Sequence, residues 1–448
     1  MVIQDTKAQI ETIKAKIEAM IEKGYFSEAR ILLDQLDAAV PGDIDVCSMR
    51  SVIYIAEGEL EKAESTIKQG LRNDSVKFDL IFNLAYLNEL KGLLQISADF
   101  YNLASSVAIT NNQIQNVNLA LDKIKTIDNG IILKKKKKIV FFVKEGMDSF
   151  LGDIIEGLSD QYWVRKVIVS KYEQIDEGMI WADICWFEWC DELVEYGSKS
   201  ILATERKIIC RIHGYEVYTD YIRKANWGNI DKIIIVAPHI KRIFEDKTKD
   251  LIKGKLVPDL IYCGLDTGKY PMTKKAKGYN LGYIGYINYK KNIPMTLDIF
   301  RKLHTIDDRY KLFIAGRFQE DRTKLYFEYF VKEYGLEDSI FFEGWLDYDQ
   351  KLVWLKKIDY MVISSIDEGL CYAAAEAMCS GIKPVLHNCE GLKDHYVKKY
   401  LFGSVDEAVD MILSSDYDSK EYNTFIEENY SNNIQLNSIN ILLEKLGV

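Results

Sequence analysis

Several features are scarce or missing in this sequence of 448 residues, and each absence argues against a class of protein. No uninterrupted apolar run approaches the ~18 residues that a membrane-spanning helix needs, so we expect no transmembrane segment. The first residues show no apolar run preceded by positive charge, so we expect no signal peptide. Positive charge is in deficit, with 58 Lys and Arg against 68 Asp and Glu. The net charge of -10 therefore argues against nucleic acid as the main partner.

The sequence also lacks the Cys-x-x-Cys pairs that mark many metal and redox sites. Its eight cysteines are scattered, and Cys185, Cys210 and Cys263 lie in or beside apolar runs. Such positions favour reduced, buried thiols in a cytoplasmic protein. Two Asp-x-Asp sequences, at 347–349 and 416–418, do not follow an apolar strand in the context of a metal site. We therefore expect neither a metal nor another cofactor.

The chain is long and apolar enough for two to four packed domains, with 48% hydrophobic residues. In residues 1–130 a glycine recurs every 34 positions and is followed five positions later by a small residue: Gly24 by Ala29, Gly58 by Ala63, and Gly92 by Ser97. This period resembles that of tetratricopeptide repeats, although the leading Trp of such repeats is absent.

Stacked helix pairs of this kind share a continuous core and present a concave surface to peptides or partner proteins. One interpretation of residues 1–130 is therefore a module that holds a protein or peptide acceptor. The alternative is a helical cap that only stabilises the rest of the chain or a homo-oligomer. The five lysines at 134–138 could contact anionic lipid or an acidic acceptor, but such a run is more often a solvated approach to a strand.

Residues 131–278 alternate short apolar runs with helical segments, a pattern typical of a doubly wound parallel sheet. The predicted strands are 139–143, 167–169, 184–187, 208–212 and 233–236. His213 follows one of these strands and precedes Gly214, and Glu188 follows another. Because ligands bind at the carboxyl ends of strands in such sheets, His213 and Glu188 are candidate site residues, with Glu188 facing an acceptor.

Residues 279–430 repeat the pattern, and the most informative stretch is SSIDEGLCYAAAEAMCSG at 364–381. An apolar strand at 360–363 leads through a loop into an Ala-rich helix that starts at Tyr372, and a further strand follows at 383–387. Glu368 precedes the helix and Glu376 lies inside it. The unpaired amides and the dipole at the helix start attract phosphate, which makes this loop an anion-binding candidate.

The spacing Glu-x7-Glu, with Gly after the first Glu and Ala-Glu-Ala-Met around the second, resembles the donor site of the retaining GT-B glycosyltransferases. The resemblance implies a GT-B fold, in which two Rossmann-like domains face a cleft, here preceded by the tetratricopeptide-like helical domain. It implies that Glu368 and His213 face the donor sugar, with Glu376 at the ribose hydroxyls. The backbone amides that would meet the sugar and the diphosphate are those of Gly369, Leu370 and Cys371.

Relatives of this group also grip the diphosphate with an Arg and a Lys after a strand that ends in Gly. Here that strand ends at Gly285, the Arg position is Tyr286, and the Lys position is Lys291. Half of the expected clamp is therefore missing, and Arg317, after the strand at 311–316, is the candidate replacement. Trp345 follows the strand at 340–344, beside which relatives place the base. In the turn that leaves the first domain, Cys263 replaces the Asn of the family.

The resemblance implies a retaining, metal-independent transfer of a sugar from a nucleoside diphosphate sugar, with UDP favoured. We expect a protein or peptide acceptor because of the helical repeats. Residues 431–448 would form a last helix that crosses back to the first Rossmann-like domain. The alternative is a non-catalytic partner subunit that binds substrate or stabilises an active transferase, which the loss of the Arg at position 286 would fit.

Overall fold

The computed structural model describes residues 2–73, 77–128, 130–131, 136–149, 151–252 and 256–447. Of the five lysines at 134–138, Lys134 and Lys135 lie outside the described residues. The chain divides into two compact units: residues 1–138 with 161–166, and residues 139–160 with 167–448. The first unit is mainly helical and the second is α/β.

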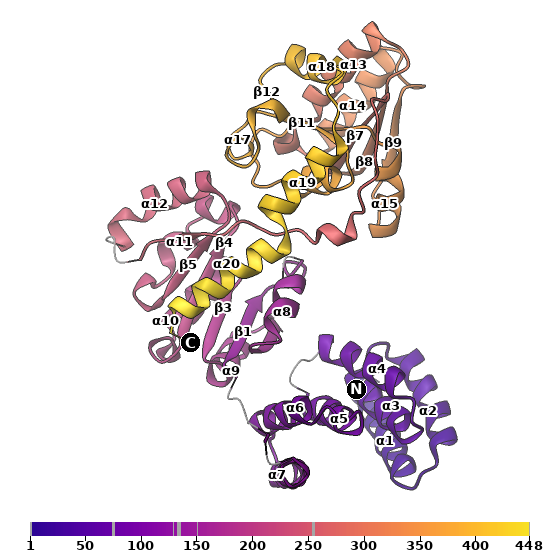
Figure 1. The fold of residues 1–448 in the computed structure, drawn as a ribbon, viewed down its shortest axis with the longest axis vertical. Helices are drawn as coiled ribbons and strands as arrows, with labels where there is room; N and C mark the ends of the chain where they lie inside the picture. Colours follow the sequence, from indigo (N-terminus) through magenta and orange to yellow (C-terminus); the bar gives the residue numbers. More distant parts are fainter. Residues whose placement is uncertain are drawn as a thin grey trace. The chain divides into compact units, whose positions relative to one another are not determined.

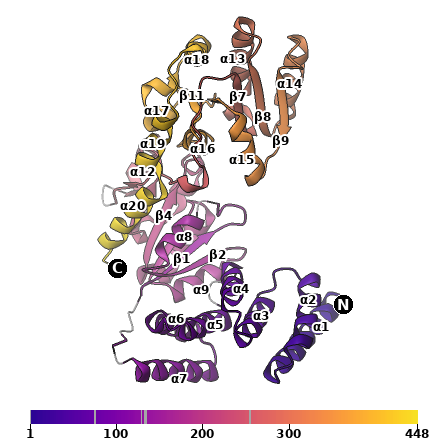
Figure 2. The ribbon, with the colours of Figure 1, turned by 45° about the vertical axis from the view of Figure 1, so that its right-hand side comes forward.

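The N-terminal unit consists of helices that follow one another as antiparallel hairpins (Figure 2). They are α1 (Val2–Glu22), α2 (Phe26–Ala39), α3 (Ile44–Ala56), α4 (Leu60–Asn73), α5 (Phe78–Leu90), α6 (Leu94–Val107) and α7 (Asn111–Ile127). The turns between the paired helices hold Gly24, Gly58 and Gly92, whose φ angles are 76°, 77° and 74°. Glycine adopts this left-handed backbone without the steric cost that a Cβ brings, which explains the 34-residue spacing in physical terms.

The small residues that follow these glycines allow the helices to pack closely. Ala29, Ala63 and Ser97 are all fully buried. The Ser97 hydroxyl donates to the Ala85 carbonyl at 2.7 Å, so this polar group is satisfied inside the core. Ile17 and Leu33 belong to one apolar cluster of this unit, and a second cluster lies further along the helices.

The first sheet is built from six strands in the order β2-β1-β3-β4-β5-β6 (Figure 1). They are β1 (Lys138–Val143), β2 (Trp163–Ile168), β3 (Ile184–Phe187), β4 (Lys207–Ile212), β5 (Lys232–Ile235) and β6 (Asp259–Leu260). The helices around it are α8 (Gly152–Leu158), α9 (Glu173–Trp181), α10 (Glu192–Lys199), α11 (Tyr221–Lys224) and α12 (Pro238–Ile252). The pairings from β1 through β3, β4 and β5 to β6 are parallel, as the continuous apolar runs predicted.

The second sheet is also six-stranded and parallel, in the order β12-β11-β10-β7-β8-β9. Its strands are β7 (Asn280–Ile287), β8 (Lys311–Phe318), β9 (Ile340–Gly344), β10 (Tyr360–Ile363), β11 (Lys383–His387) and β12 (Leu401–Phe402). Its helices are α13 (Ile293–Ile306), α14 (Asp321–Glu333), α15 (Tyr348–Lys357), α16 (Tyr372–Cys379), α17 (Leu392–His395), α18 (Val405–Leu413) and α19 (Ser419–Tyr430). The strand order reverses between β7 and β10, and such a switch point is where open α/β sheets bind ligands.

The last helix, α20 (Asn432–Lys445), returns to the first α/β domain. It packs against α8, where Leu436 occupies the space beside Gly157, and a Cβ at Gly157 would lie 2.4 Å from the Leu436 side chain. The Asn432 side chain donates to Asp153 at 2.7 Å. These contacts tie the end of the chain to the start of the first α/β domain.

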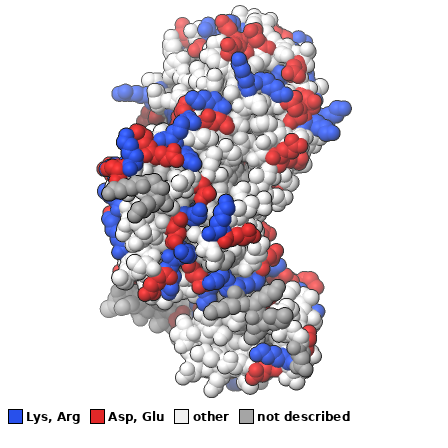
Figure 3. Space-filling model, turned by 60° about the vertical axis from the view of Figure 1, so that its left-hand side comes forward, with Lys and Arg blue, Asp and Glu red and all other residues white. Residues whose placement is uncertain are grey.

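The hydropathy of the helices, the state of the cysteines and the charge of one surface can be described directly. Across the described ranges, no helix is both long enough and apolar enough to cross a bilayer. All eight cysteines are free and buried. On the face drawn in Figure 3, basic and acidic side chains are interspersed.

Candidate functional site

Two loops meet at the switch point of the second sheet, one after β7 and one after β10. Ser364 joins them, because its buried hydroxyl lies 2.9 Å from the carbonyl oxygens of both Lys291 and Asn292. The Ile366 amide donates to the Lys290 carbonyl at 2.9 Å. Two segments that are far apart in the sequence are therefore fixed side by side at one edge of the sheet.

This junction brings Lys291 and Glu368 together. Lys291 ends the short 3-10 helix η5 (Tyr289–Lys291), and its ammonium forms an ion pair with the carboxylate of Glu368. Lys290 lies 3.6 Å from the other carboxylate oxygen, and the Glu368 side chain is only 10% exposed. Burial acts to lower the pKa of Lys291, but the nearby Cys371 and Glu368 raise it above the usual range. Two cations and one carboxylate thus occupy the place where the sequence predicted donor contacts.

The loop between Glu368 and α16 leaves its first part open. A Cβ at Gly369 would meet nothing within 4 Å, whereas Leu370 and Cys371 are buried. Cys371 is the residue before α16 and has a φ of 55°, an uncommon left-handed conformation for a residue with a side chain. Burial, and then the proximity of Glu368, raise the pKa of its thiol to about 12, so the thiol is neutral. Only the backbone of Cys371 is therefore suited to meet an anion.

Beside this loop lies a cavity of about 280 Å³. It is lined by residues at the carboxyl ends of β7 and β8, by the segment after β9, and by α16; they include Gly285, Gly316, Trp345, Lys351 and Glu376. Three of the candidate residues named from the sequence therefore share one cavity: Gly285, Trp345 and Glu376. The Glu376 carboxylate accepts hydrogen bonds from the Tyr270 hydroxyl and the Lys351 ammonium, both at 2.6 Å.

Tyr286 and Arg317 are neighbours across the paired strands β7 and β8. The Tyr286 ring packs against Trp345, with 5.0 Å between the ring centroids, and remains 46% exposed. Arg317 is exposed, and it is not among the residues that line the cavity. Arg317 therefore lies on the strand beside the position that lacks the expected Arg, next to Gly316, which lines the cavity.

His213 lies in a different group, at the carboxyl edge of the first sheet. Its Nε2 is 2.9 Å from Glu188, and its ring stacks on Trp189 with 4.0 Å between centroids. Arg211 donates to Glu188 at 3.0 Å and to the sulfur of Cys263 at 3.2 Å. Glu188 is fully buried, so its carboxylate faces this cluster of side chains and not the solvent, unlike the expectation that it faces an acceptor.

The electrostatics of this cluster are set by its burial and its charges. Burial acts to lower the pKa of His213, but hydrogen bonds with Cys263 and Glu188 raise it to about 9. Burial opposes the ionisation of Glu188, and the neighbouring Arg211 and His213 hold its pKa below the usual range. The same two cations lower the pKa of Cys263 against the effect of burial. His213 is therefore an imidazolium at neutral pH.

Tyr372, the first residue of α16, reaches the first α/β domain. Its hydroxyl donates to the Gly264 carbonyl at 3.1 Å, next to Cys263. A second connection joins His239 at the start of α12 to Asp367, with 3.4 Å between them. The loop that carries Glu368 is thus in contact with the first α/β domain on both sides.

The sequence did not identify several residues that belong to the site in the structure. Arg211 gave a usable signal, because an Arg inside an apolar strand must be paired when it is buried. Lys351 and Tyr270 gave none, because neither belongs to a motif and each reaches Glu376 only through the tertiary fold. The two Asp-x-Asp sequences have a simpler explanation, since Asp347 and Asp418 cap the N-termini of α15 and α19.

Comparison with known proteins shows a family similarity for the second α/β domain and a fold for most of the chain. Residues 271–431 match the family model of Glycosyl transferases group 1. The GDP-mannose:cellobiosyl-diphosphopolyprenol alpha-mannosyltransferase of Xanthomonas campestris is 29% identical over 124 residues, 28% of this chain and 32% of that protein. The chain thus matches about a third of the length of this curated relative.

Two solved structures resemble the chain over a larger part. Anabaena Alr3699/HepE in complex with UDP has a TM-score of 0.58 at 13% identity, with 69% of this chain and 100% of that chain covered. Sucrose-phosphate synthase from Thermosynechococcus elongatus has a TM-score of 0.53 at 13% identity, with 69% and 99% covered. With its two parallel six-stranded sheets, the chain has the GT-B fold of these structures, preceded by an all-helical region, and its residues 271–431 are similar to Glycosyl transferases group 1.

Proposed function

We propose that the protein is a retaining, metal-independent glycosyltransferase that uses a nucleoside diphosphate sugar, with UDP as the favoured nucleotide. One observation carries the proposal. The cavity lined by Trp345 and Glu376 lies at the same edge of one sheet as the cationic pair Lys290 and Lys291, which contacts Glu368 in the loop before α16. The match to Glycosyl transferases group 1 supports it. UDP and UDP-glucose in the structures of HepE support a uridine nucleotide.

In this proposal the donor lies across the loop between β10 and α16. Glu376 would accept hydrogen bonds from the ribose hydroxyls, since a carboxylate has about four acceptor sites and Tyr270 and Lys351 use only some of them. Gly285 would leave room for the nucleotide, and Trp345 with Tyr286 would contact the base. The amides of Gly369, Leu370 and Cys371 would meet the diphosphate or the sugar.

The departing diphosphate needs stabilisation more than the reaction needs a strong base. Lys291 would supply one positive charge, and at ~4 Å a unit charge pair contributes about 4 kcal/mol at an effective dielectric of roughly 20. Arg317 would supply a second cation in place of the Arg that Tyr286 replaces. Glu368 would orient the sugar through its hydroxyls, and His213 would face the sugar from the first domain. The diphosphate itself would take the acceptor's proton on the front face.

The acceptor proposed from the sequence is a protein or peptide held by the tetratricopeptide-like helices. The turns at Gly24, Gly58 and Gly92 and the buried small residues support a repeat of helix pairs. The eight free, buried cysteines fit the reducing cytoplasm, where we propose that the reaction takes place.

The test is turnover of UDP- and GDP-sugars, by transfer or by slow hydrolysis, in the wild type and in Glu368→Gln. Glu368→Gln keeps the shape of the side chain but removes the charge that Lys291 neutralises and that would orient the sugar. Loss of a charged hydrogen bond costs about 1.5–3 kcal/mol, so we expect turnover to fall about tenfold to a hundredfold. Glu343→Gln, which removes another lysine partner in the same domain, is the matched control. Full activity of Glu368→Gln would contradict the proposal.

A non-catalytic partner subunit is the second candidate, and Tyr286 in place of a cation favours it. Such a protein would bind nucleotide sugars without converting them. A rise in melting temperature with UDP-sugars, together with no turnover of any donor, would support this candidate over catalysis.

A further inference from the structure

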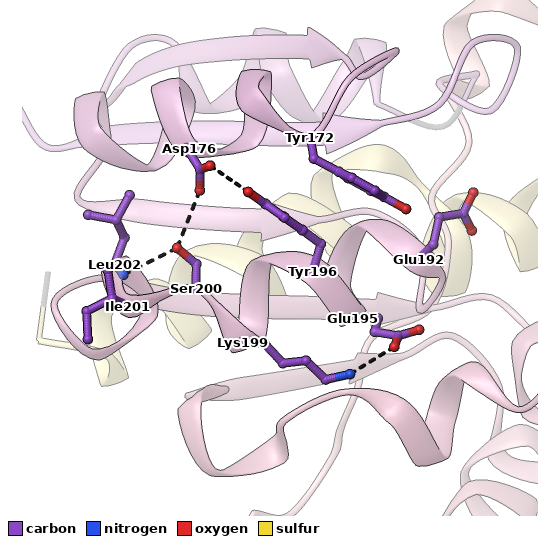
Figure 4. A pocket seen from close by; sticks show the side chains of 9 residues that line it. All are labelled: Tyr172, Asp176, Glu192, Glu195, Tyr196, Lys199, Ser200, Ile201 and Leu202. Atoms are coloured by element: carbon purple, nitrogen blue, oxygen red, sulfur yellow. Dashed lines mark hydrogen bonds and ion pairs between the residues drawn. The ribbon is translucent and has the colours of Figure 1, made fainter.

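A second cavity, separate from the α16 loop, lies between α9 and α10 of the first α/β domain (Figure 4). Its volume is about 680 Å³, within the range of about 300–1,000 Å³ that small-molecule sites occupy. Its wall combines two tyrosine rings, Tyr172 and Tyr196, with the carboxylates of Asp176, Glu192 and Glu195 and the ammonium of Lys199. We call this cavity the α9–α10 groove.

The two tyrosines form a fixed aromatic surface. Their rings are stacked, with 4.6 Å between centroids and 7° between the ring planes. The Tyr196 hydroxyl donates to Asp176 at 2.6 Å, and this hydrogen bond raises the pKa of the phenol to about 12. Tyr172 is 45% exposed, and no hydrogen bond to its hydroxyl is found among the described residues. Stacking on Tyr196 therefore holds the Tyr172 ring in place, with one face open and its hydroxyl available. A ligand that binds there loses little affinity to the ordering of this side chain.

Two of the three carboxylates of the groove are paired with lysines, and the third accepts a hydrogen bond from a tyrosine. Asp176 accepts from Tyr196, Glu192 is paired with Lys144 at 2.9 Å, and Glu195 is paired with Lys199 at 2.8 Å. A cationic ligand would compete with a lysine at Glu192 or Glu195 and would find only Asp176 without one, and an anionic ligand would meet three carboxylates. An uncharged ligand rich in hydroxyls would neither compete with a lysine nor be repelled by the carboxylates, because each carboxylate keeps acceptor sites for further hydrogen bonds.

The groove begins at the carboxyl edge of the first sheet. α9 starts soon after β2, and α10 starts soon after β3, so the groove runs from the edge that also carries His213. Lys144, which follows β1, lies 2.9 Å from Glu192 in the groove and 3.0 Å from Asp191, the residue before α10. The groove is thus continuous with the loops on which this fold places its ligands.

We propose that the α9–α10 groove binds an uncharged saccharide, and that this saccharide is part of the acceptor. The apolar C–H face of a sugar ring packs on Tyr172, while its hydroxyls donate to Asp176, Glu192 and Glu195. The role as acceptor rests on the proposed glycosyltransferase function, whereas saccharide binding does not. An acceptor of this kind already carries sugar before the transfer, whether or not a peptide portion is held elsewhere.

Saccharide binding is tested on the full chain without any donor, by saturation-transfer NMR and calorimetry. The probes are maltose, cellobiose, lactose and diacetylchitobiose, used up to the millimolar range that weak sites require. We expect at least one disaccharide to bind. Its Kd should rise about tenfold in Tyr172→Ala, which removes the aromatic face, and change little in Tyr172→Phe, which keeps the face. Tyr329→Ala, at a tyrosine of α14 that is 58% exposed, is the control for loss of a surface ring.

Two results would overturn the proposal: no binding of any of the four disaccharides, or binding that Tyr172→Ala does not weaken while the variant melts like the wild type. In the first case, binding of tetramethylammonium in the groove would indicate a cation site instead. The outcome is distinct from that of the donor assay. Saccharide binding without turnover would remove only the glycosyltransferase proposal, and turnover without saccharide binding would remove only the groove.

Discussion

Arg211 lies in a strand that otherwise contains apolar side chains, and it is only 1% exposed. Its charge is balanced by Glu188 at 3.0 Å, and it also donates to Cys263 at 3.2 Å. Buried ion pairs of this kind seldom increase stability over an apolar core, because desolvation of the charges offsets their attraction. We interpret the cluster as a means of holding His213 in a fixed orientation and in its charged form.

The charge on His213 gives a pH prediction. Its pKa of about 9 in the folded protein exceeds the usual 6.5, so the charged ring contributes stability that is fully present below about pH 6.5 and is lost as pH rises through 9. In Glu188→Gln the ring loses one of its two partners, while burial, Arg211 and the hydrogen bond with Cys263 remain, so we expect the pKa of His213 to fall from about 9. NMR titration of the ring protons measures it directly.

Glu337→Gln, at an exposed site in the second α/β domain, should leave the titration of His213 unchanged. The free energy of unfolding should also decline less between pH 7 and 9 in Glu188→Gln than in the wild type. A ring that still titrates near pH 9 without Glu188 would show that another group holds the proton.

At the scale of elements, the loop between β10 and α16 depends on the neighbouring loop after β11. The Glu368 amide donates to the Glu390 carbonyl at 3.2 Å, and Asp367 pairs with Glu390 as an isolated bridge. Gly391 follows with a φ of 95°, and a Cβ there would lie 1.7 Å from the Glu368 carbonyl oxygen and 2.7 Å from the His239 ring. Only glycine allows the two loops to approach so closely.

Gly391→Ala should therefore displace the backbone of Glu368. Overpacking against fixed backbone, added to an unfavourable φ, is expected to cost about 2 kcal/mol or more in the free energy of unfolding and to weaken UDP-sugar binding. Chemical denaturation and nucleotide titration measure the two effects. Gly403→Ala is the control, since its Cβ would meet only the flexible end of Glu407 at 3.3 Å. A Gly391→Ala protein with wild-type stability and nucleotide affinity would show that the loop tolerates the shift.

At the scale of the whole molecule, the apolar clusters follow the two units. One large cluster contains side chains of both α/β domains, such as Val140 and Ala374. A second cluster lies within the second α/β domain, and further clusters lie within the helical unit. The two α/β domains are therefore expected to unfold together, because the larger of their two apolar clusters contains side chains of both. The helical unit has its own cores and is expected to unfold in a transition of its own.

Calorimetry with and without UDP tests this arrangement. A ligand stabilises only the part that binds it, by about 2.7 kcal/mol when its concentration is 100 times the Kd. We expect UDP to raise the temperature of the α/β transition and to leave the helical transition in place. A single transition that moves as a whole would show that the units unfold cooperatively.

The sequence alone determined the architecture, because that depends on local patterns. The 34-residue glycine spacing predicted the helical turns, and the short apolar runs predicted most strands of the two parallel sheets; β6 and β12 were not among them. The stretch 360–381 predicted the strand, loop and helix around Glu368 and Glu376. These features follow from backbone propensity and burial over a few residues, so they can be read without knowledge of the fold.

The tertiary structure decided which side chains meet. Lys351 and Tyr270 reach Glu376, Arg317 lies beside Tyr286, and His213 is charged by neighbours from other strands. The α9–α10 groove has no motif, because its tyrosines and carboxylates come from two helices whose contact depends on packing. Distances between segments remote in sequence, and the pKa shifts that depend on them, are set by the fold and not by any local pattern.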